Sequence, residues 1–396
     1  MTQTTKNNIY TSEFDDIRPY DDHQFREKIA TLVREPGFEH AVRYVMPDVD
    51  YQGFVAGLLD VKDKWQFQHD VMWPFLEMLA KKTTSGIDMS GAGLLEEGVH
   101  YTFITNHRDI VLDASFLNLM MLRNNLPTSE VAIGNNLLIF DWITDLVKLN
   151  KSFIVKRNLE IKQALSAAQH LSAYIHYAVG KKGESVWIAQ REGRAKDSND
   201  VTQDSLIKML ALAGGECVIG NLKQINLCPV SISYEYDPND YLKAREFLLK
   251  RNDPEFKKSQ RDDLFSMETG LLQFKGHVHF DVGGCINREL DSIDPGLEKA
   301  EAIRTVCEII DRKIHSGYKI YPINYIAHDK LHGVNEYRHF YTDDDESAFE
   351  AYLDRQLDKV RGEIDFQPTA DDLGYMREMM YRMYANPLKN KRLAGA

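Results

Sequence analysis

Apolar residues recur at helical spacing through the first 85 or so residues, and the pattern then changes to short β-type runs that alternate with helical stretches. Within the first region, the segment 54–80 predicts a long helix that Pro74 kinks. Its apolar residues at helical spacing are Trp65, Met72, Phe75, Leu76 and Leu79. The first 85 residues are therefore expected to form a helical N-terminal region.

From residue 86, the pattern predicts strands and helices in alternation. The expected strands span 101–105, 152–155, 185–189, 226–234 and 277–280. The expected helices span 111–122, 160–179, 204–213 and 297–314. Such alternation is typical of an α/β domain whose sheet is mixed and at least partly parallel, with helices on its flanks. We place this domain at 86–330, followed by a helical, acidic C-terminal tail at 331–396.

Composition limits the classes of function. The 48 basic residues against 60 acidic residues give a net charge of −12, which argues against a protein held to nucleic acid by a basic field. Every apolar run is broken well before the 18 or more residues of a spanning helix, and residues 1–16 contain no apolar signal core. The 4 Cys residues are scattered without CxxC spacing, which fits reduced thiols and excludes a Cys-type zinc site. We expect a cytoplasmic protein.

Polar and charged residues follow three of the predicted strands. His107 follows the first strand, with Asp109 and Asp113 close behind it, and a histidine with a carboxylate partner can act as a general base. A His–Asp pair in a loop is more often structural than catalytic. The further candidates are Lys156, Arg157, Glu192, Gly193, Arg194 and Lys196. The cations among them suit an anionic substrate, and the glycine would allow close approach of the backbone.

Four blocks of sequence, in this order, resemble the signature of the glycerolipid acyltransferases, the glycerol-3-phosphate and 1-acylglycerol-3-phosphate acyltransferases. The blocks are 106–113, 153–157, 191–194 and 228–235, and the resemblance covers about residues 86–316. It implies that His107 deprotonates an acceptor hydroxyl for attack on an acyl thioester. It also implies that the basic residues of the second and third blocks hold the acceptor phosphate and that Pro229 lines the acyl channel.

The resemblance further implies phospholipid biosynthesis with acyl-CoA or an acyl carrier protein as co-substrate, no other cofactor and no metal. Backbone N–H groups near Gly193 would stabilise the oxyanion. The expected partners are that acyl donor, a phosphorylated glycerol-type acceptor and the anionic surface on the inner face of the membrane, but no nucleic acid. The basic stretch 243–261 is the candidate for the membrane contact, with a solvated helix as the equal alternative.

The chain departs from the family pattern in two places. Five residues separate His107 from Asp113 where the family has four, and the third block lacks one residue between Gly193 and Arg194. Asp113 is favoured as the partner of His107 because it lies near the start of a predicted helix, with Asp109 as the alternative. The chain is thus expected to belong to a divergent branch.

Two other functions stay open at this point. A thioesterase would use the same base with water as acceptor, although it would not need the cations. A non-catalytic lipid- or phosphate-binding protein could retain the same fold. Two further features are predicted to be structural. They are the histidine pair His277 and His279, and the aromatic group Trp65, Phe67, Trp73 and Phe75.

Overall fold

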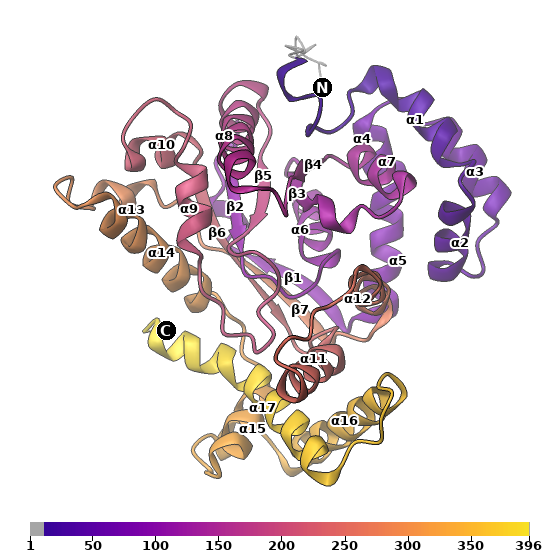
Figure 1. Ribbon diagram of the computed structural model, residues 1–396, viewed down its shortest axis with the longest axis vertical. Coiled ribbons are helices and arrows are strands. Elements are labelled where there is room, and N and C mark those ends of the chain that lie inside the picture. Colours follow the sequence, from indigo (N-terminus) through magenta and orange to yellow (C-terminus); the bar gives the residue numbers. More distant parts are fainter. Residues whose placement is uncertain (1–11, 396) are drawn as a thin grey trace.

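A seven-stranded sheet forms the centre of the molecule (Figure 1). The computed structural model describes residues 12–395, so most of the segment in which we looked for a signal core lies outside the described residues. The strand order is β1-β7-β6-β2-β5-β3-β4, and the only antiparallel neighbours among the described strands are β6 and β7. The strands are β1 (Gly86–Ser90), β2 (Thr102–Thr105), β3 (Glu130–Gly134), β4 (Ser152–Val155), β5 (Val186–Ala189), β6 (Leu227–Tyr234) and β7 (His277–Val282). The predicted mixed α/β class is confirmed.

Helices cover both faces of the sheet. One core packs the sheet against α8 (Ile161–Tyr177), α9 (Asp204–Leu210), α10 (Val218–Gln224), α13 (Asn287–Asp291) and α14 (Lys299–Ser316). The other packs it against α5 (Trp73–Thr83) and α6 (Leu112–Arg123). Because both faces are covered, every residue of the central strands β2 and β6 is buried, the threonines of β2 and the serines of β6 included.

The five predicted strands are all present, but β1 and β3 were not predicted. In β1 every residue remains at least partly exposed, so the apolar signal is weak. In β3 the first residue, Glu130, is fully buried, and its carboxylate binds Lys182 and the Tyr174 hydroxyl, each at 2.5 Å. Because both partners lie more than 40 positions further along the chain, the sequence near Glu130 does not show that this carboxylate is buried, and a charged residue there favours a loop.

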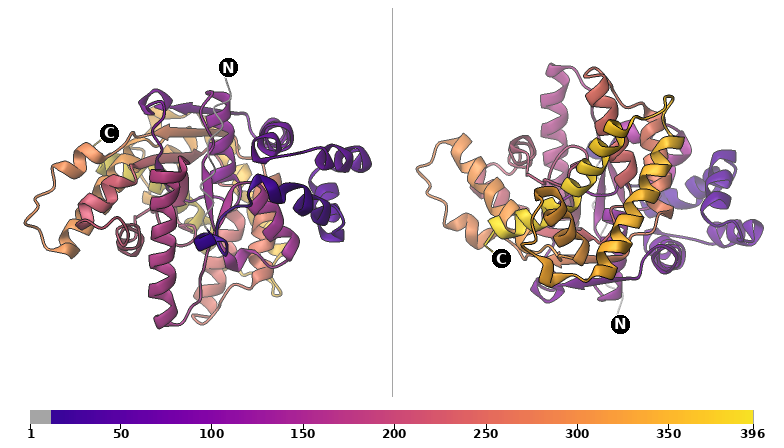
Figure 2. Two further views of the ribbon diagram at one scale, coloured as in Figure 1. Left: turned by 90° about the horizontal axis from the view of Figure 1, so that it is seen from above. Right: turned by 90° about the horizontal axis from the view of Figure 1, so that it is seen from below.

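The N-terminal region is helical, but the predicted single helix over 54–80 is wrong. The chain forms α1 (Phe25–Leu32), α2 (Pro36–Val45), α3 (Tyr51–Leu59), the short α4 (Lys64–Gln66), a π-helical segment (Phe67–Met72) and then α5. Residues 64–83 nevertheless form one uninterrupted run of helical backbone, in which Pro74 lies directly after the π-helical segment. A π-helical turn beside a proline is a common way for a helix to tolerate its missing N–H. Helices α1 to α3 and the π-helical segment enclose a small core, and α1 to α3 stand to one side of the sheet (Figure 2), whereas α5 packs on the sheet itself.

The C-terminal helices form a further core with α11 (Asp240–Asn252). They are α15 (Pro322–His332), α16 (Asp343–Gly362) and α17 (Ala370–Leu393), and the right-hand view of Figure 2 looks onto α16 and α17. Two helices remain. They are α7 (Asp141–Leu149), which packs with the N-terminal helices, and α12 (Gln260–Leu272), which follows α11. Fully buried Asp240 joins these helices, because its carboxylate accepts hydrogen bonds from Tyr352 and Tyr384, both at 2.6 Å.

Substituting Asp240 by asparagine should flatten the dependence of stability on pH. Burial raises the pKa of Asp240 to about 6, against about 3.9 in an unfolded chain. Between these values only the folded protein holds the proton, so stability should fall as pH rises, by about 2–3 kcal/mol in total. Urea unfolding of wild type and Asp240→Asn at about pH 4 and pH 7 measures the difference. The exposed control Asp365→Asn should follow wild type, and an Asp240→Asn protein with the wild-type slope would contradict the assignment.

Candidate active site

His107 lies just beyond the carboxyl end of β2, a central strand of the sheet. The preceding residue, Asn106, is fully buried, and its side chain continues the pairing with β6 through hydrogen bonds to the backbone of Ile232. Its side-chain amide donates to the carbonyl of Ile232 at 2.9 Å and its oxygen accepts from the N–H of Ile232 at 2.8 Å. Since β2 to β6 all run in one direction, their carboxyl ends meet at one edge of the sheet, where ligands bind in α/β folds.

The His107 ring is held from behind by Asp113, which is fully buried in the first turn of α6. His107 Nδ1 lies 2.8 Å from Asp113 Oδ2, and the same oxygen accepts from the N–H groups of Arg108 at 2.7 Å and Asp109 at 3.1 Å. This contact assigns the proton to Nδ1 and leaves Nε2 as the basic nitrogen. The side chain of His107 is 13% exposed.

Asp109 has a different task. Its Oδ1 accepts from the N–H groups of Val111 at 2.9 Å and Leu112 at 2.7 Å, which caps the start of α6, and its Oδ2 accepts from Asn239 at 3.1 Å. Burial and the nearby Asp113 raise the pKa of Asp109. The loop therefore absorbs the extra residue as a helix cap, and the contact with His107 falls to Asp113.

Arg194 lies in the loop after β5, the strand next to β2. The side chain is buried, and its Nη1 has no hydrogen-bond partner. Among residues 12–395 no acidic side chain forms an ion pair with it. Both polar atoms of the buried Gln190 side chain, four positions earlier, also lack partners. A buried guanidinium without an ion-pair partner is costly, and this one is suited to receive an anion.

Arg157 and Glu192 connect the second and third sequence blocks. Arg157, after β4, donates its backbone N–H to Asn135 at 2.9 Å, and its Nη1 lies 3.4 Å from Glu192 Oε1. A Cβ added at Gly134 would lie 2.8 Å from Arg157 Nε, so the arginine passes close over the backbone that ends β3. Gly193 has φ +68°, which favours glycine. Arg157 therefore links the loops that follow β3, β4 and β5.

The remaining candidates are Lys156, Lys196 and Pro229, and the two lysines have carboxylate partners. Lys156 binds Asp16 of the N-terminal segment at 2.5 Å, and both side chains are exposed. Lys196 binds Glu246 on α11 at 3.0 Å, while burial and the charge of Arg194 lower the pKa of Lys196 to about 7. Pro229 is buried in β6 opposite Ile104, three residues before His107.

Several residues of this region carried no signal in the sequence. Trp187 on β5 meets the His107 ring edge to face, with centroids 5.9 Å apart. Arg108 makes a two-pronged ion pair with buried Asp200, at 2.8 and 2.6 Å. Strand alternation could have placed Trp187 on a face of β5, but it could not have paired Asp200 with Arg108 across 92 positions.

The expected basic surface over 243–261 is largely neutralised. Lys243 is fully buried, where it binds Asp237 at 2.5 Å and donates to the carbonyl of Arg108 at 3.3 Å, so its inclusion in a membrane-facing stretch is wrong. Other members pair with acidic residues, as Lys250 and Lys258 do with Glu246. No helix of the described chain is both long enough and apolar enough to cross a membrane.

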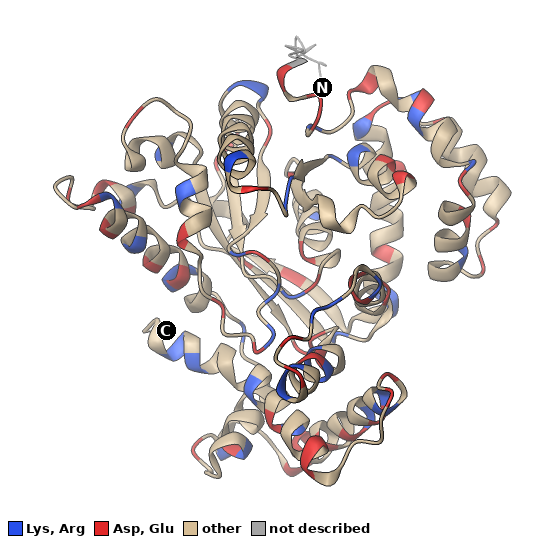
Figure 3. Cartoon of the chain, viewed as in Figure 1, with Lys and Arg blue, Asp and Glu red and all other residues tan. Residues whose placement is uncertain are grey.

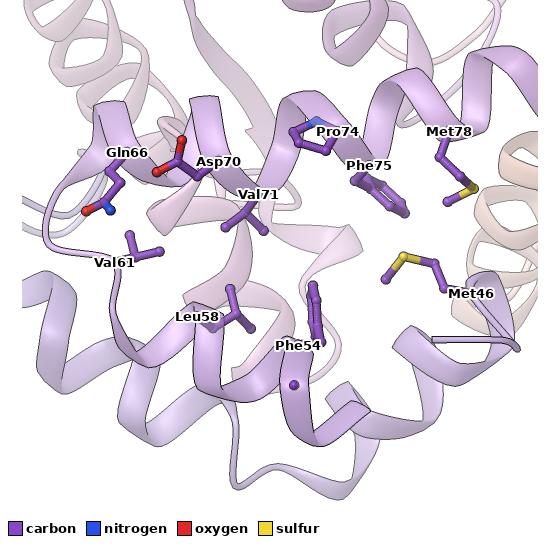
Figure 4. Close-up of a pocket in the computed structure, with 12 residues that line it drawn as sticks. Met46, Phe54, Leu58, Val61, Gln66, Asp70, Val71, Pro74, Phe75 and Met78 are labelled. Atoms are coloured by element: carbon purple, nitrogen blue, oxygen red, sulfur yellow. The ribbon is translucent and has the colours of Figure 1, made fainter. Parts of the chain in front are cut away.

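The histidine pair of β7 and the N-terminal aromatic group were both predicted to be structural. His277 and His279 on β7 both face Asp88 of β1, and His277 also lies 3.1 Å from the Tyr321 hydroxyl. The N-terminal aromatic group was predicted to form a buried helix face. This is confirmed for Phe67 but is wrong for Trp65, which is 67% exposed. Phe75 lines an apolar cavity of about 360 Å³ between α3 and α5 (Figure 4). No candidate catalytic residue lines this cavity.

Comparison with solved structures gives a distant likeness. No known protein-family profile matches the chain, and no curated protein matches it in sequence. A crystal structure of the 1-acyl-sn-glycerophosphate (LPA) acyltransferase PlsC from Thermotoga maritima is similar to 72% of this chain over 95% of its own, with 12% sequence identity and a TM-score of 0.38.

Proposed function

We propose that this protein is an acyltransferase that moves a fatty acyl group from a thioester to the hydroxyl of a glycerol-phosphate type acceptor. The observation that carries the proposal is the hydrogen bond between His107 and the buried Asp113, at the same sheet edge as the buried Arg194, which has no ion-pair partner within residues 12–395 and whose Nη1 has no hydrogen-bond partner there. A base with a free Nε2 and a cation without an ion-pair partner are the two groups that such an acceptor needs. The four-block resemblance in the sequence supports the same conclusion.

In the proposed reaction, His107 Nε2 takes the proton of the acceptor hydroxyl while its oxygen attacks the thioester carbonyl. Asp113 keeps the Nδ1 proton in place and stabilises the imidazolium that forms. The tetrahedral intermediate carries an oxyanion, for which backbone N–H groups near Gly193 are the proposed donors. Collapse breaks the C–S bond, and the leaving thiolate takes the proton from the imidazolium.

Arg194 is the proposed ligand of the acceptor phosphate, with Arg157 as the second cation. Both follow strands whose carboxyl ends share the edge with His107. The contact of Arg157 with the exposed Glu192 side chain, at 3.4 Å, is longer than the ion pairs of Lys156 and Lys196 and is easier to exchange for a phosphate. Lys156 and Lys196 would serve only if they left their carboxylate partners, so we assign them no direct contact. Approach of the protein to an anionic bilayer, with Lys257 and Arg261 rather than Lys243 as surface cations, remains part of the proposal.

The decisive experiment offers radiolabelled acyl-CoA and acyl carrier protein thioester to the purified protein with a panel of acceptors. The panel holds glycerol-3-phosphate, lysophosphatidate, their phosphate-free analogues and water alone. Label in the ester product supports the acyltransferase and identifies the donor. Release of free fatty acid without any ester would instead identify a thioesterase, and no consumption of either donor would leave a binding protein.

Substituting Arg194 by methionine should raise the KM for the phosphorylated acceptor by about 10- to 150-fold, which corresponds to about 1.5–3 kcal/mol for a lost charge-assisted hydrogen bond. The KM for the acyl donor should change little, and stability should not fall, because a buried unpaired charge is replaced by an apolar chain of similar length. Steady-state kinetics with both substrates measures this. The control Arg123→Met, which removes a partly exposed arginine bound to Glu77, should leave both constants unchanged. Equal changes in both constants would contradict the assignment.

A further inference from the structure

A second cavity lies apart from the candidate active site, between α15, the C-terminal end of α17 and the loop that joins α14 to α15. Its volume is about 540 Å³, which lies in the range of small-molecule sites. No residue of the proposed catalytic set lines it. The lining residues used below are Lys319, Tyr325, Tyr337, Phe340, Lys391 and Arg392.

One wall of the cavity is aromatic. Tyr325 and Phe340 stack with their ring centroids 4.5 Å apart and their planes at 10°, and Tyr337 packs 5.3 Å from Tyr325. Phe340 is nevertheless 49% exposed, so part of its ring is open to a ligand. The guanidinium of Arg392 lies 5.6 Å from the centre of the Tyr337 ring. A wall of this kind favours a flat aromatic ring over an aliphatic chain.

Three cations line the same cavity, in a protein whose net charge is −12. Lys391 and Arg392 lie on the last turns of α17, where Figure 3 shows basic residues at the C-terminal end of the helix. Lys391 donates to the carbonyls of Ser316 at 2.9 Å and Tyr318 at 2.6 Å, and within residues 12–395 it forms no ion pair. One of its three N–H groups is left for a ligand.

The other two cations are only loosely engaged. Lys319 lies 3.4 Å from Asp88, and Arg392 lies 3.2 Å from Glu336, all with substantially exposed side chains. Exposed pairs of this kind contribute little and exchange readily for a stronger anion. The cavity thus offers an aromatic wall and up to three cationic side chains that can donate hydrogen bonds to an anion.

We propose that this cavity binds a phosphate-bearing aromatic ligand of the adenine-nucleotide class. The base would pack on the exposed part of Phe340 and Tyr337, and the phosphates would meet Lys391, Arg392 and Lys319. The shared chemistry can come from a free nucleotide or from the nucleotide end of coenzyme A. A headgroup that carries phosphate but no ring would leave the aromatic wall unused.

Tyr318 connects the cavity to the His107 loop. Tyr318 lines the cavity, and its hydroxyl donates to Asp200 at 2.6 Å, the carboxylate that holds Arg108. A ligand in the cavity would therefore contact Tyr318, whose partner Asp200 holds Arg108, the residue directly after His107. The binding site stands independently of acyl transfer, because it can be measured without turnover.

Calorimetric titration of the full chain tests the site, with AMP, ADP and CoA as nucleotide probes and adenosine, inorganic phosphate and glycerol-3-phosphate as partial ones. We expect the nucleotides to bind and each partial probe to bind at least tenfold more weakly. CoA binding more tightly than ADP would point to the acyl donor, and equal binding would point to a free nucleotide. Absence of nucleotide binding, or tighter binding of glycerol-3-phosphate than of ADP, would overturn the proposal.

Two surface variants separate the site from general effects on folding. Arg392→Gln removes a cation and Phe340→Ala removes part of the aromatic wall, and both residues are exposed enough for the fold to persist. Each should weaken ADP binding about tenfold or more. The matched control is Arg382→Gln on the same helix, outside the cavity, which should bind as wild type does. Binding unchanged in both test variants would overturn the assignment of the cavity.

Discussion

Substitution of His107 by alanine should lower the rate of acyl transfer by about 10²–10⁴-fold, the usual contribution of a positioned general base. The side chain contacts Asp113 and Trp187, but the loop itself is held by Asn106 and by the cap of α6. We therefore expect the fold to persist in the variant. Initial rates with a saturating acceptor, alongside the unfolding midpoint in urea, measure both quantities.

A matched control for this variant is His170→Ala. His170, on α8, also contacts a carboxylate, Asp16, at 3.0 Å, and that carboxylate binds Lys156, to which we assign no contact with the substrate. This variant should retain wild-type transfer. If a folded His107→Ala protein turned over at the wild-type rate, the proposed mechanism would be wrong, whatever the donor or acceptor.

Substitution of Asp113 by asparagine should cost nearly as much activity as loss of His107. The carboxylate fixes the proton on Nδ1 and balances the charge of the imidazolium, whereas an amide can offer its NH₂ group and stabilise the wrong tautomer. We expect a fall in kcat of about 10²–10⁴-fold with little change in the acceptor KM. The Asp113 oxygen that contacts His107 also accepts from the N–H groups of Arg108 and Asp109. In the alternative orientation, an asparagine oxygen at that position would keep these contacts and the loop geometry, but it would carry no charge to balance the imidazolium.

The comparison that decides the role of Asp113 is Asp109→Asn. The new amide side chain would retain an oxygen that caps α6, and asparagine is a good helix cap, so both activity and stability should fall only mildly. Kinetics and unfolding of the two variants should be measured side by side. A severe loss of kcat in folded Asp109→Asn with a mild one in Asp113→Asn would transfer the supporting role to Asp109.

Most of the α/β core could be predicted from the sequence. The run at 152–155 became β4 with the same bounds, and the runs after 101, 185, 226 and 277 became strands within one or two residues. These strands are mostly buried and apolar, so their signal is local. In contrast, β3 begins with a buried glutamate whose partners, Lys182 and Tyr174, come from α8 and the π-helical turn after it. Local patterns carry no information on such pairing.

The candidate site divides in the same way. The sequence by itself determined that His107, Arg157 and Arg194 would each follow a strand, because strand ends are marked by local changes from apolar to polar residues. Only the tertiary structure decided which of these groups have partners. Asp109 and Asp113 both follow His107 closely along the chain, but helix capping and Asn239 occupy Asp109. Lys196 is neutralised by Glu246 and Arg194 has no ion-pair partner within residues 12–395, since α11 brings a carboxylate to one and not to the other.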